Sequence, residues 1–159
     1  REVSRGRAHE GAGEINTARM KITLVAVGKT QAKELQPSIL EYTKRISHYA
    51  SFEFMVASEE KLAKSLDRFD RVFLLDESGA EYGSKAFASF IDKQMGSGAK
   101  NIAFVVGGPF GFSPEVRELA DSSISLSKMT FPHDLVRVIF LEQLYRAFTI
   151  LKNENYHHE

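Results

Sequence analysis

Short apolar runs alternate with longer amphipathic segments along this chain, and this alternation constrains its fold more than any other feature. Runs rich in β-branched and aromatic residues occupy residues 21–27, 52–56, 71–75 and 101–106. Nearly continuous apolar runs of this length are typical of strands that are buried on both faces of a parallel sheet. Helical spacing and capping residues predict helices over residues 32–48, 59–66, 84–95, 114–120 and 134–152.

Together with a brief fifth strand over residues 123–126, this order predicts an α/β fold whose mostly parallel sheet is flanked by helices. The chain has 159 residues, which is the size of one ordinary domain. Residues 1–19 show no apolar period, and no apolar segment of a signal peptide follows their arginines. We therefore interpret residues 1–19 as a non-native or disordered leader and residues 20–159 as a single domain.

Composition excludes several classes of protein. The absence of cysteine excludes a disulfide framework, a thiolate zinc site and a cysteine nucleophile, and it suits a cytoplasmic protein. No apolar run approaches the roughly 20 residues of a membrane-spanning helix, so no membrane partner is expected. The formal net charge of zero argues against a protein that coats nucleic acid through bulk electrostatics. If RNA is a partner, the basic surface must be local or supplied by two subunits together.

Candidate ligand-binding loops follow the strands, because open parallel sheets bind ligands beyond the carboxyl ends of their strands. The most unusual of them begins with Gly107 and Gly108, which would let the backbone approach a ligand closely. Pro109 breaks the Gly-x-Gly-x-x-Gly fingerprint, and this disfavours a nucleotide-binding oxidoreductase. Spacing alone leaves a simple tight turn and a ligand pocket as equal alternatives.

Two further segments combine polar and titratable groups. Residues 125–133 (SLSKMTFPH) offer hydroxyl and backbone groups, although an ordinary loop with capping residues would have the same composition. Residues 155–159 (NYHHE) contain histidines that could act near neutral pH, although a frayed terminus is the common alternative. Two adjacent histidines do not face one metal ion from a helix, and no second ligand cluster is evident, so no metal site is expected.

Several of these segments, in order and with matching spacing from Met20 to Glu159, resemble the ribosomal RNA large subunit methyltransferase H family of the SPOUT superfamily. The matching segments are residues 75–79 (LDESG), 104–114 (FVVGGPFGFSP), 125–133, 135–147 (LVRVIFLEQLYRA) and 156–159 (YHHE). The resemblance implies a trefoil knot near the C-terminus, S-adenosylmethionine as methyl donor and a homodimer. It also implies methylation at N3 of a pseudouridine in helix 69 of 23S rRNA, on the assembled ribosome.

The resemblance also implies which residues contact the donor: Leu75, Gly107, Gly108, Leu126, Ser127, Lys128, Met129, Thr130, Phe131 and Pro132. The N3 nitrogen bears a proton at neutral pH, so a group must help to remove it. Our candidates for the catalytic set are His133, Arg137, Tyr156 and His157. We expect His157 or His133 to accept the proton, and Arg137 to stabilise negative charge on the base or to bind phosphate. A SPOUT methyltransferase with another RNA target and a non-catalytic ribosome-binding relative remain the alternatives.

Overall fold

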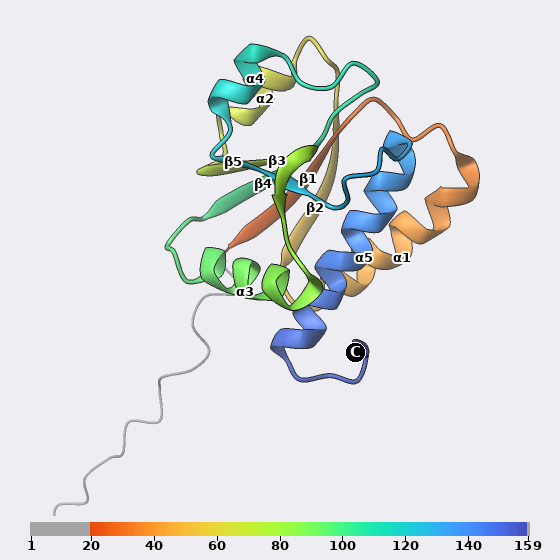
Figure 1. The fold of residues 1–159 in the computed structure, drawn as a ribbon, viewed down its shortest axis with the longest axis vertical. Helices are drawn as coiled ribbons and strands as arrows, with labels where there is room; N and C mark the ends of the chain where they lie inside the picture. Colours follow the sequence, from red (N-terminus) through yellow and green to blue (C-terminus); the bar gives the residue numbers. More distant parts are fainter. Residues whose placement is uncertain (1–19, 159) are drawn as a thin grey trace, which may run out of the picture.

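The computed structural model describes residues 20–158, in which five strands form one parallel sheet (Figure 1). The order across the sheet is β2-β1-β4-β3-β5. The strands are β1 (Lys21–Val27), β2 (Ser51–Ala57), β3 (Arg71–Glu81), β4 (Asn101–Val106) and β5 (Ser122–Ser125). The α/β class with a parallel sheet is therefore confirmed, whereas the interpretation of residues 1–19 as a leader lies outside the described residues.

Helices cover both faces of this sheet (Figure 1). On one face, α5 (His133–Leu151) packs between α1 (Gln36–Ile46) and α3 (Ser84–Met95), and the 3-10 turn η1 (Lys33–Leu35) leads into α1. On the other face, α2 (Leu62–Leu66) contacts α4 (Pro114–Leu119). Within residues 20–158, no helix is both long enough and apolar enough to cross a membrane.

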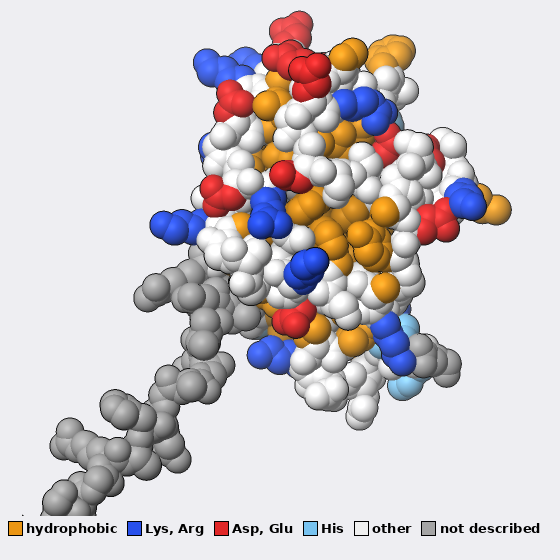
Figure 2. Space-filling view, turned by 60° about the vertical axis from the view of Figure 1, so that its left-hand side comes forward, with side chains coloured by type: hydrophobic (Ala, Val, Ile, Leu, Met, Phe, Trp, Pro, Cys, Tyr) orange, Lys and Arg blue, Asp and Glu red, His pale blue; other side chains and the backbone are white. Residues whose placement is uncertain are grey.

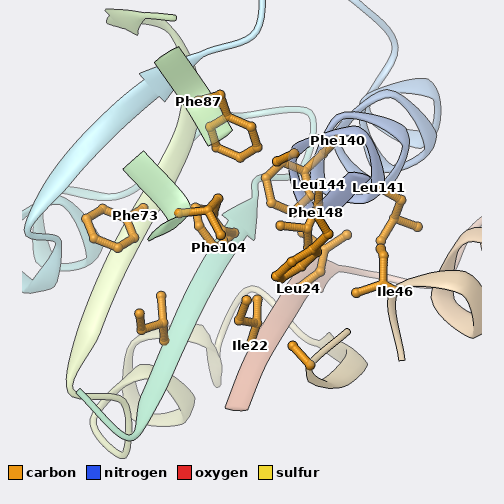
Figure 3. Close-up of a cluster of buried hydrophobic side chains, with 14 of the residues drawn as sticks. Ile22, Leu24, Ile46, Phe73, Phe87, Phe104, Phe140, Leu141, Leu144 and Phe148 are labelled. Atoms are coloured by element: carbon orange, nitrogen blue, oxygen red, sulfur yellow. The ribbon is translucent and has the colours of Figure 1, made fainter. Parts of the chain in front are cut away.

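Alternate residues of the central strands supply the two layers of the core. Ile22 and Leu24 join the cluster under α1, α3 and α5, whereas Val25 and Val27 join the cluster under α2 and α4. Phenylalanine rings fill the larger cluster, with the Phe104 ring centroid 4.8 Å from that of Phe140 (Figure 3). The aromatic side chains of this layer therefore build the core rather than a surface for stacking bases.

The prediction that the third strand ends at Leu75 is wrong. β3 continues to Glu81, and after a register shift Ala80 and Glu81 pair with Ile124 and Ser125 of β5. Gly79 permits this pairing, because a Cβ there would lie 2.6 Å from the carbonyl carbon of Ser123. The turn-forming residues before Gly79 therefore produce an irregularity inside a strand, as a β-bulge does, and do not end it.

Candidate active site

A cavity of about 250 Å³ opens beyond the carboxyl end of β4, beside the part of β3 where its pairing with β4 ends at Leu75. Two loops line it: residues 107–112, which follow β4, and residues 126–132, which join β5 to α5. His133 and Val136, in the first turn of α5, complete the wall. Segments that are distant in sequence therefore meet where parallel sheets bind their ligands.

The cavity walls contain every residue that the resemblance assigns to the donor except Lys128. Those in the walls are Leu75, Gly107, Gly108, Leu126, Ser127, Met129, Thr130, Phe131 and Pro132. The Lys128 side chain is 84% exposed and lies with its Nζ 3.7 Å from the Glu81 carboxylate. Ser127 orders its own loop, because its carbonyl accepts a hydrogen bond from Ser125 Oγ and its hydroxyl accepts one from the Met129 amide.

The walls also contain residues that the sequence reasoning did not select: Asp76, Glu77, Val106, Pro109, Gly111, Phe112 and Val136. Asp76 accepts hydrogen bonds from the backbone amide of Ser78 at 3.0 Å and from Arg117 Nη2 at 2.7 Å. The amide of Ser78, more than any other group, holds the pKa of Asp76 below its ordinary value. The wall therefore contains a carboxylate that stays ionised, in the same LDESG segment that supplied Leu75.

The loop that begins with Gly107 and Gly108 is both a tight turn and part of the cavity wall, the two alternatives that spacing alone leaves open. The amide of Gly111 donates to the carbonyl of Gly108 at 3.1 Å, so Pro109 and Phe110 occupy the tip of a tight turn. The same loop lines the cavity. A Cβ on Gly107 would lie 3.1 Å from the ring of Phe112, itself a wall residue, so a side chain at Gly107 would push that ring. The absence of a side chain at Gly107 thus preserves the shape of the cavity.

Arg137 lies apart from the cavity wall, and its side chain is fully buried. Its Nη2 donates to the carbonyl of Val27 at 2.9 Å, and its Nη1 donates to Thr30 Oγ1 at 2.9 Å. Asp134 Oδ2 accepts from the amides of Gln31 and Ala32, and Asp134 Oδ1 faces Arg137 Nε at 3.8 Å. Burial lowers the pKa of the Arg137 guanidinium, and the Asp134 carboxylate opposes that shift. Arg137 and Asp134 therefore bind the loop after β1 to the first turn of α5.

His133 is the one residue of the expected catalytic set that lines the cavity within residues 20–158. It is the first residue of α5, after the N-cap Pro132. Its Nε2 lies 3.9 Å from Asp134 Oδ1, beyond hydrogen-bonding distance. Within residues 20–158 no hydrogen bond of this ring is found, so the imidazole is available to a ligand in the cavity that it lines.

The C-terminal segment is held against the other end of α5. The Tyr156 hydroxyl donates to Glu142 Oε1 at 3.1 Å, and the Tyr156 ring lies 4.9 Å from the guanidinium of Arg146. Arg146 Nη1 lies 3.1 Å from His157 Nδ1. Since a guanidinium only donates, His157 Nδ1 accepts this bond, and a neutral His157 carries its hydrogen on Nε2. Burial raises the pKa of the Tyr156 hydroxyl, so the phenol stays protonated.

The cavity and the C-terminal segment of one chain do not meet. At 1.5 Å per residue, Glu142 and Arg146 lie about 14 and 20 Å along α5 from His133. In Figure 1 the segment that follows α5 leaves the opposite end of that helix from the loop that leads into it. The structure therefore brings His133 to the cavity but leaves Arg137, Tyr156 and His157 away from the cavity of their own chain.

A family model described as "Predicted SPOUT methyltransferase" matches residues 20–157 of the chain. The ribosomal RNA large subunit methyltransferase H of Christiangramia forsetii is 49% identical over 156 residues, which are 87% of this chain and 99% of that protein. The chain belongs to this family of SPOUT methyltransferases. The enzyme of the same name from Porphyromonas gingivalis is 44% identical over 157 residues, which are 88% of this chain and 100% of that protein.

Solved structures share this fold at low sequence identity. A probable methylase family protein from Haemophilus influenzae superposes with a TM-score of 0.54 at 9% identity, over 90% of this chain and 72% of that one. A probable methyltransferase from Bordetella pertussis gives 0.52 at 9% identity, over 83% and 95%. These likenesses support the sheet and its flanking helices, while the trefoil knot that the family implies stays a prediction.

The described part of this SPOUT methyltransferase, residues 20–158, contains no group of three or more histidine, cysteine, aspartate or glutamate side chains placed to hold a metal ion. Methyl transfer from a sulfonium carbon needs mainly positioning and removal of a proton. The groups that could supply both are those of the cavity wall and of the C-terminal segment.

Replacing Glu142 by alanine is expected to release the C-terminal segment of this SPOUT methyltransferase from α5. Glu142 accepts from the Tyr156 hydroxyl and from Arg146 Nε, and Arg146 in turn holds His157. Hydrogen bonds to a charged group contribute roughly 1.5–3 kcal/mol. We expect amide hydrogen exchange in residues 153–158 to rise about tenfold or more. Glu41→Ala, which removes a solvent-exposed Arg45 contact, is the control and should leave that exchange unchanged; equal exchange in Glu142→Ala and wild type would contradict this role of Glu142.

Proposed function

We propose that this chain transfers the methyl group of S-adenosylmethionine to N3 of a pseudouridine in helix 69 of 23S rRNA, on the assembled ribosome. The observation that carries the proposal is the meeting of residues 107–112 and 126–133 around one cavity at the carboxyl edge of the sheet. The names of the curated relatives, ribosomal RNA large subunit methyltransferase H, support an RNA of the large subunit as the substrate.

The chemistry of the wall suits this donor. S-adenosylmethionine combines apolar surface with a sulfonium and an ammonium group, both cationic. Leu75, Phe112 and Val136 offer apolar contacts, while Asp76 and Glu77 bring negative charge to the same cavity. The glycine loop and the loop over residues 126–132 expose backbone groups that can bond the adenine and the carboxylate. When bound, the donor supplies a methyl carbon that an acceptor nitrogen attacks, and the S–CH₃ bond breaks as the N–CH₃ bond forms.

The proton of the acceptor nitrogen needs a base, and two histidines are candidates. We assign this role to His133, because it is the histidine that lines the cavity within residues 20–158. His157 suits a different role, because Arg146 occupies its Nδ1 and leaves an N–H on Nε2. That N–H can donate a hydrogen bond to a carbonyl oxygen of the base as negative charge develops there. Arg137 bonds the carbonyl of Val27 and faces Asp134, the residue after His133, so it is a positioning residue for the first turn of α5.

A homodimer would bring the cavity of one copy together with the C-terminal segment of the other. In one chain the C-terminal segment lies about 14–20 Å along α5 from the cavity. A second copy that packs against α5 can supply its own Tyr156 and His157 to that cavity. The charge balance fits the same arrangement: Figure 2 shows basic and acidic side chains interspersed on one face rather than a single basic patch. Two copies and a structured ribosome would together provide the binding surface that a neutral monomer lacks.

Transfer of a labelled methyl group tests the proposal. We expect the purified chain to methylate ribosomes that lack the modification, at one position of helix 69, and to label naked rRNA fragments weakly. Gly107→Val, whose Cβ would lie 3.1 Å from the Phe112 ring of the cavity wall and whose methyl groups need further space, should strongly reduce labelling and donor binding. Labelling of another nucleotide would show that the proposed acceptor is wrong, while the assignment of the donor site would stand. Donor binding without methyl transfer to any RNA would contradict the proposal that this chain methylates RNA. Robust labelling of a free hairpin would contradict the requirement for the ribosome.

Replacing His133 by alanine is expected to lower kcat about 100-fold, because general base catalysis contributes about 10²–10⁴ in rate. Donor affinity, measured by calorimetry, should fall much less than kcat. His48→Ala, at an exposed position after α1, is the matched control and should retain the wild-type kcat. A wild-type kcat in His133→Ala together with a large loss in His157→Ala would move the base to the C-terminal segment.

A further inference from the structure

Phe110 is the most exposed of the large apolar side chains in the described part of the chain, at 93%. Apolar side chains of this size gain stability from burial, so a fully exposed ring contributes little to the folded monomer. Its position is nevertheless well defined. Pro109 and Phe110 form the tip of the turn closed by the Gly111 amide and the Gly108 carbonyl, and proline restricts the backbone there.

The ring projects beside the cavity rather than into it. The residues on either side of it, Pro109 and Gly111, line the cavity, whereas Phe110 does not. Met129, 73% exposed, belongs to the opposite loop and does line the cavity. Phe110 therefore lies at the surface beside the cavity, between two residues of its wall, where a strand that delivers a base to the cavity can reach it.

We propose that Phe110 is a stacking platform for a nucleobase next to the methylated nucleotide. An enzyme that modifies a ring nitrogen takes its target base out of the stack, and this leaves the neighbouring bases with exposed faces. Aromatic side chains bind such faces with little dependence on sequence. Phe110 then holds the strand while the target base enters the cavity. This inference rests on the proposed function, because it requires an RNA acceptor at this cavity.

The rigidity of the turn supports this role over a passive one. Gly111 has φ of +71°, a left-handed conformation that favours glycine, and it lets the chain fold back directly after Phe110. The turn thus presents one aromatic ring to the solvent at a fixed distance from the cavity wall. A ring on a rigid turn loses little conformational entropy when a base stacks on it.

Steady-state kinetics with ribosomes tests the inference. We expect Phe110→Ala to raise the KM for ribosomes about tenfold, the range of alanine substitutions at stacked bases, while kcat and the affinity for S-adenosylmethionine stay at wild-type values. Phe110→Tyr and Phe110→Trp should restore KM, and Phe110→Leu should not, because leucine is apolar but has no aromatic face. Leu40→Ala, which removes a 70% exposed side chain from α1, is the control and should leave KM unchanged.

Three outcomes would overturn the inference. A wild-type KM in Phe110→Ala would show that no base depends on this ring, and full rescue by leucine would indicate an apolar contact other than stacking. A change in sedimentation of Phe110→Ala would place the ring in a contact between two copies of the chain. The two kinetic results require a wild-type enzyme that methylates ribosomes. Failure of that reaction itself would instead count against the proposed function, so the two failures are distinguishable.

Discussion

Replacing Gly79 by alanine is expected to lower the free energy of unfolding by about 3 kcal/mol, at the upper end of the usual cost of overpacking. The new Cβ would lie 2.6 Å from the carbonyl carbon of Ser123 and 2.7 Å from the amide nitrogen of Ile124. Both are backbone atoms of β5, so no side-chain rotation relieves the clash, and β5 has to move away from β3. Since β5 leads into residues 126–132 of the cavity wall, donor affinity should fall as well. Urea denaturation followed by circular dichroism, with calorimetry of donor binding, measures both effects.

Gly83→Ala is the matched control for this experiment. Nothing lies within 4 Å of the position of its Cβ, and Gly83 is the N-cap of α3 with φ of −68°. Glycine is a better N-cap than alanine, and its replacement by alanine is expected to lower the free energy of unfolding by less than about 1 kcal/mol. Equal stability of Gly79→Ala and Gly83→Ala would contradict the close approach of β3 and β5.

Replacing Arg137 by alanine is expected to lower the free energy of unfolding by about 3–5 kcal/mol, the cost of removing one partner of a buried ion pair. The substitution leaves the carbonyl of Val27 without its donor and removes the cation that faces Asp134. It also leaves a cavity between the end of β1 and α5. The midpoint of urea denaturation measures the loss, and the temperature of thermal unfolding should fall with it.

Arg45→Ala is the control, because Arg45 also pairs with a carboxylate on its own helix but at the surface. Exposed pairs of this kind contribute about 0.3–0.5 kcal/mol. An Arg137→Ala protein that is as stable as Arg45→Ala but has lost methyl transfer would return Arg137 to the role expected from the sequence, direct stabilisation of charge on the base or the phosphate. A large loss of stability with residual activity under folding conditions supports the positioning role.

Much of this architecture could be predicted from the sequence, because buried parallel strands and amphipathic helices leave strong periodic patterns. The N-cap Ser113 with Pro114 after it is one example: the Ser113 hydroxyl accepts a hydrogen bond from the Val116 amide, as capping chemistry predicts. The extension of β3 could not be predicted in the same way. Residues 76–79 have the composition of a turn, and only β5, which pairs with Leu75 before them and with Ala80 after them, keeps them inside the strand.

The sequence predicts which loops form the site, but it does not predict the environment of individual side chains. Helical spacing places Arg137 on the same helix as His133 without showing that the guanidinium turns inward, to Val27 and Thr30. These partners are more than 100 positions away in sequence, so no local pattern reports them. The C-terminal segment is a similar case, because Tyr156 and His157 contact Glu142 and Arg146, which lie 14 and 11 residues earlier in the chain. Asp76 and Glu77, by contrast, could have been found from the LDESG segment that supplied Leu75.

A crystal structure of the chain with S-adenosylhomocysteine, the demethylated product of the donor, would locate the donor site. We expect the ligand between residues 107–112 and 126–132, with His133 at its sulfur end and with Tyr156 and His157 contributed by a second copy. A ligand bound at another surface, or no binding by the intact chain at millimolar concentration, would contradict the assignment of this cavity as the donor site.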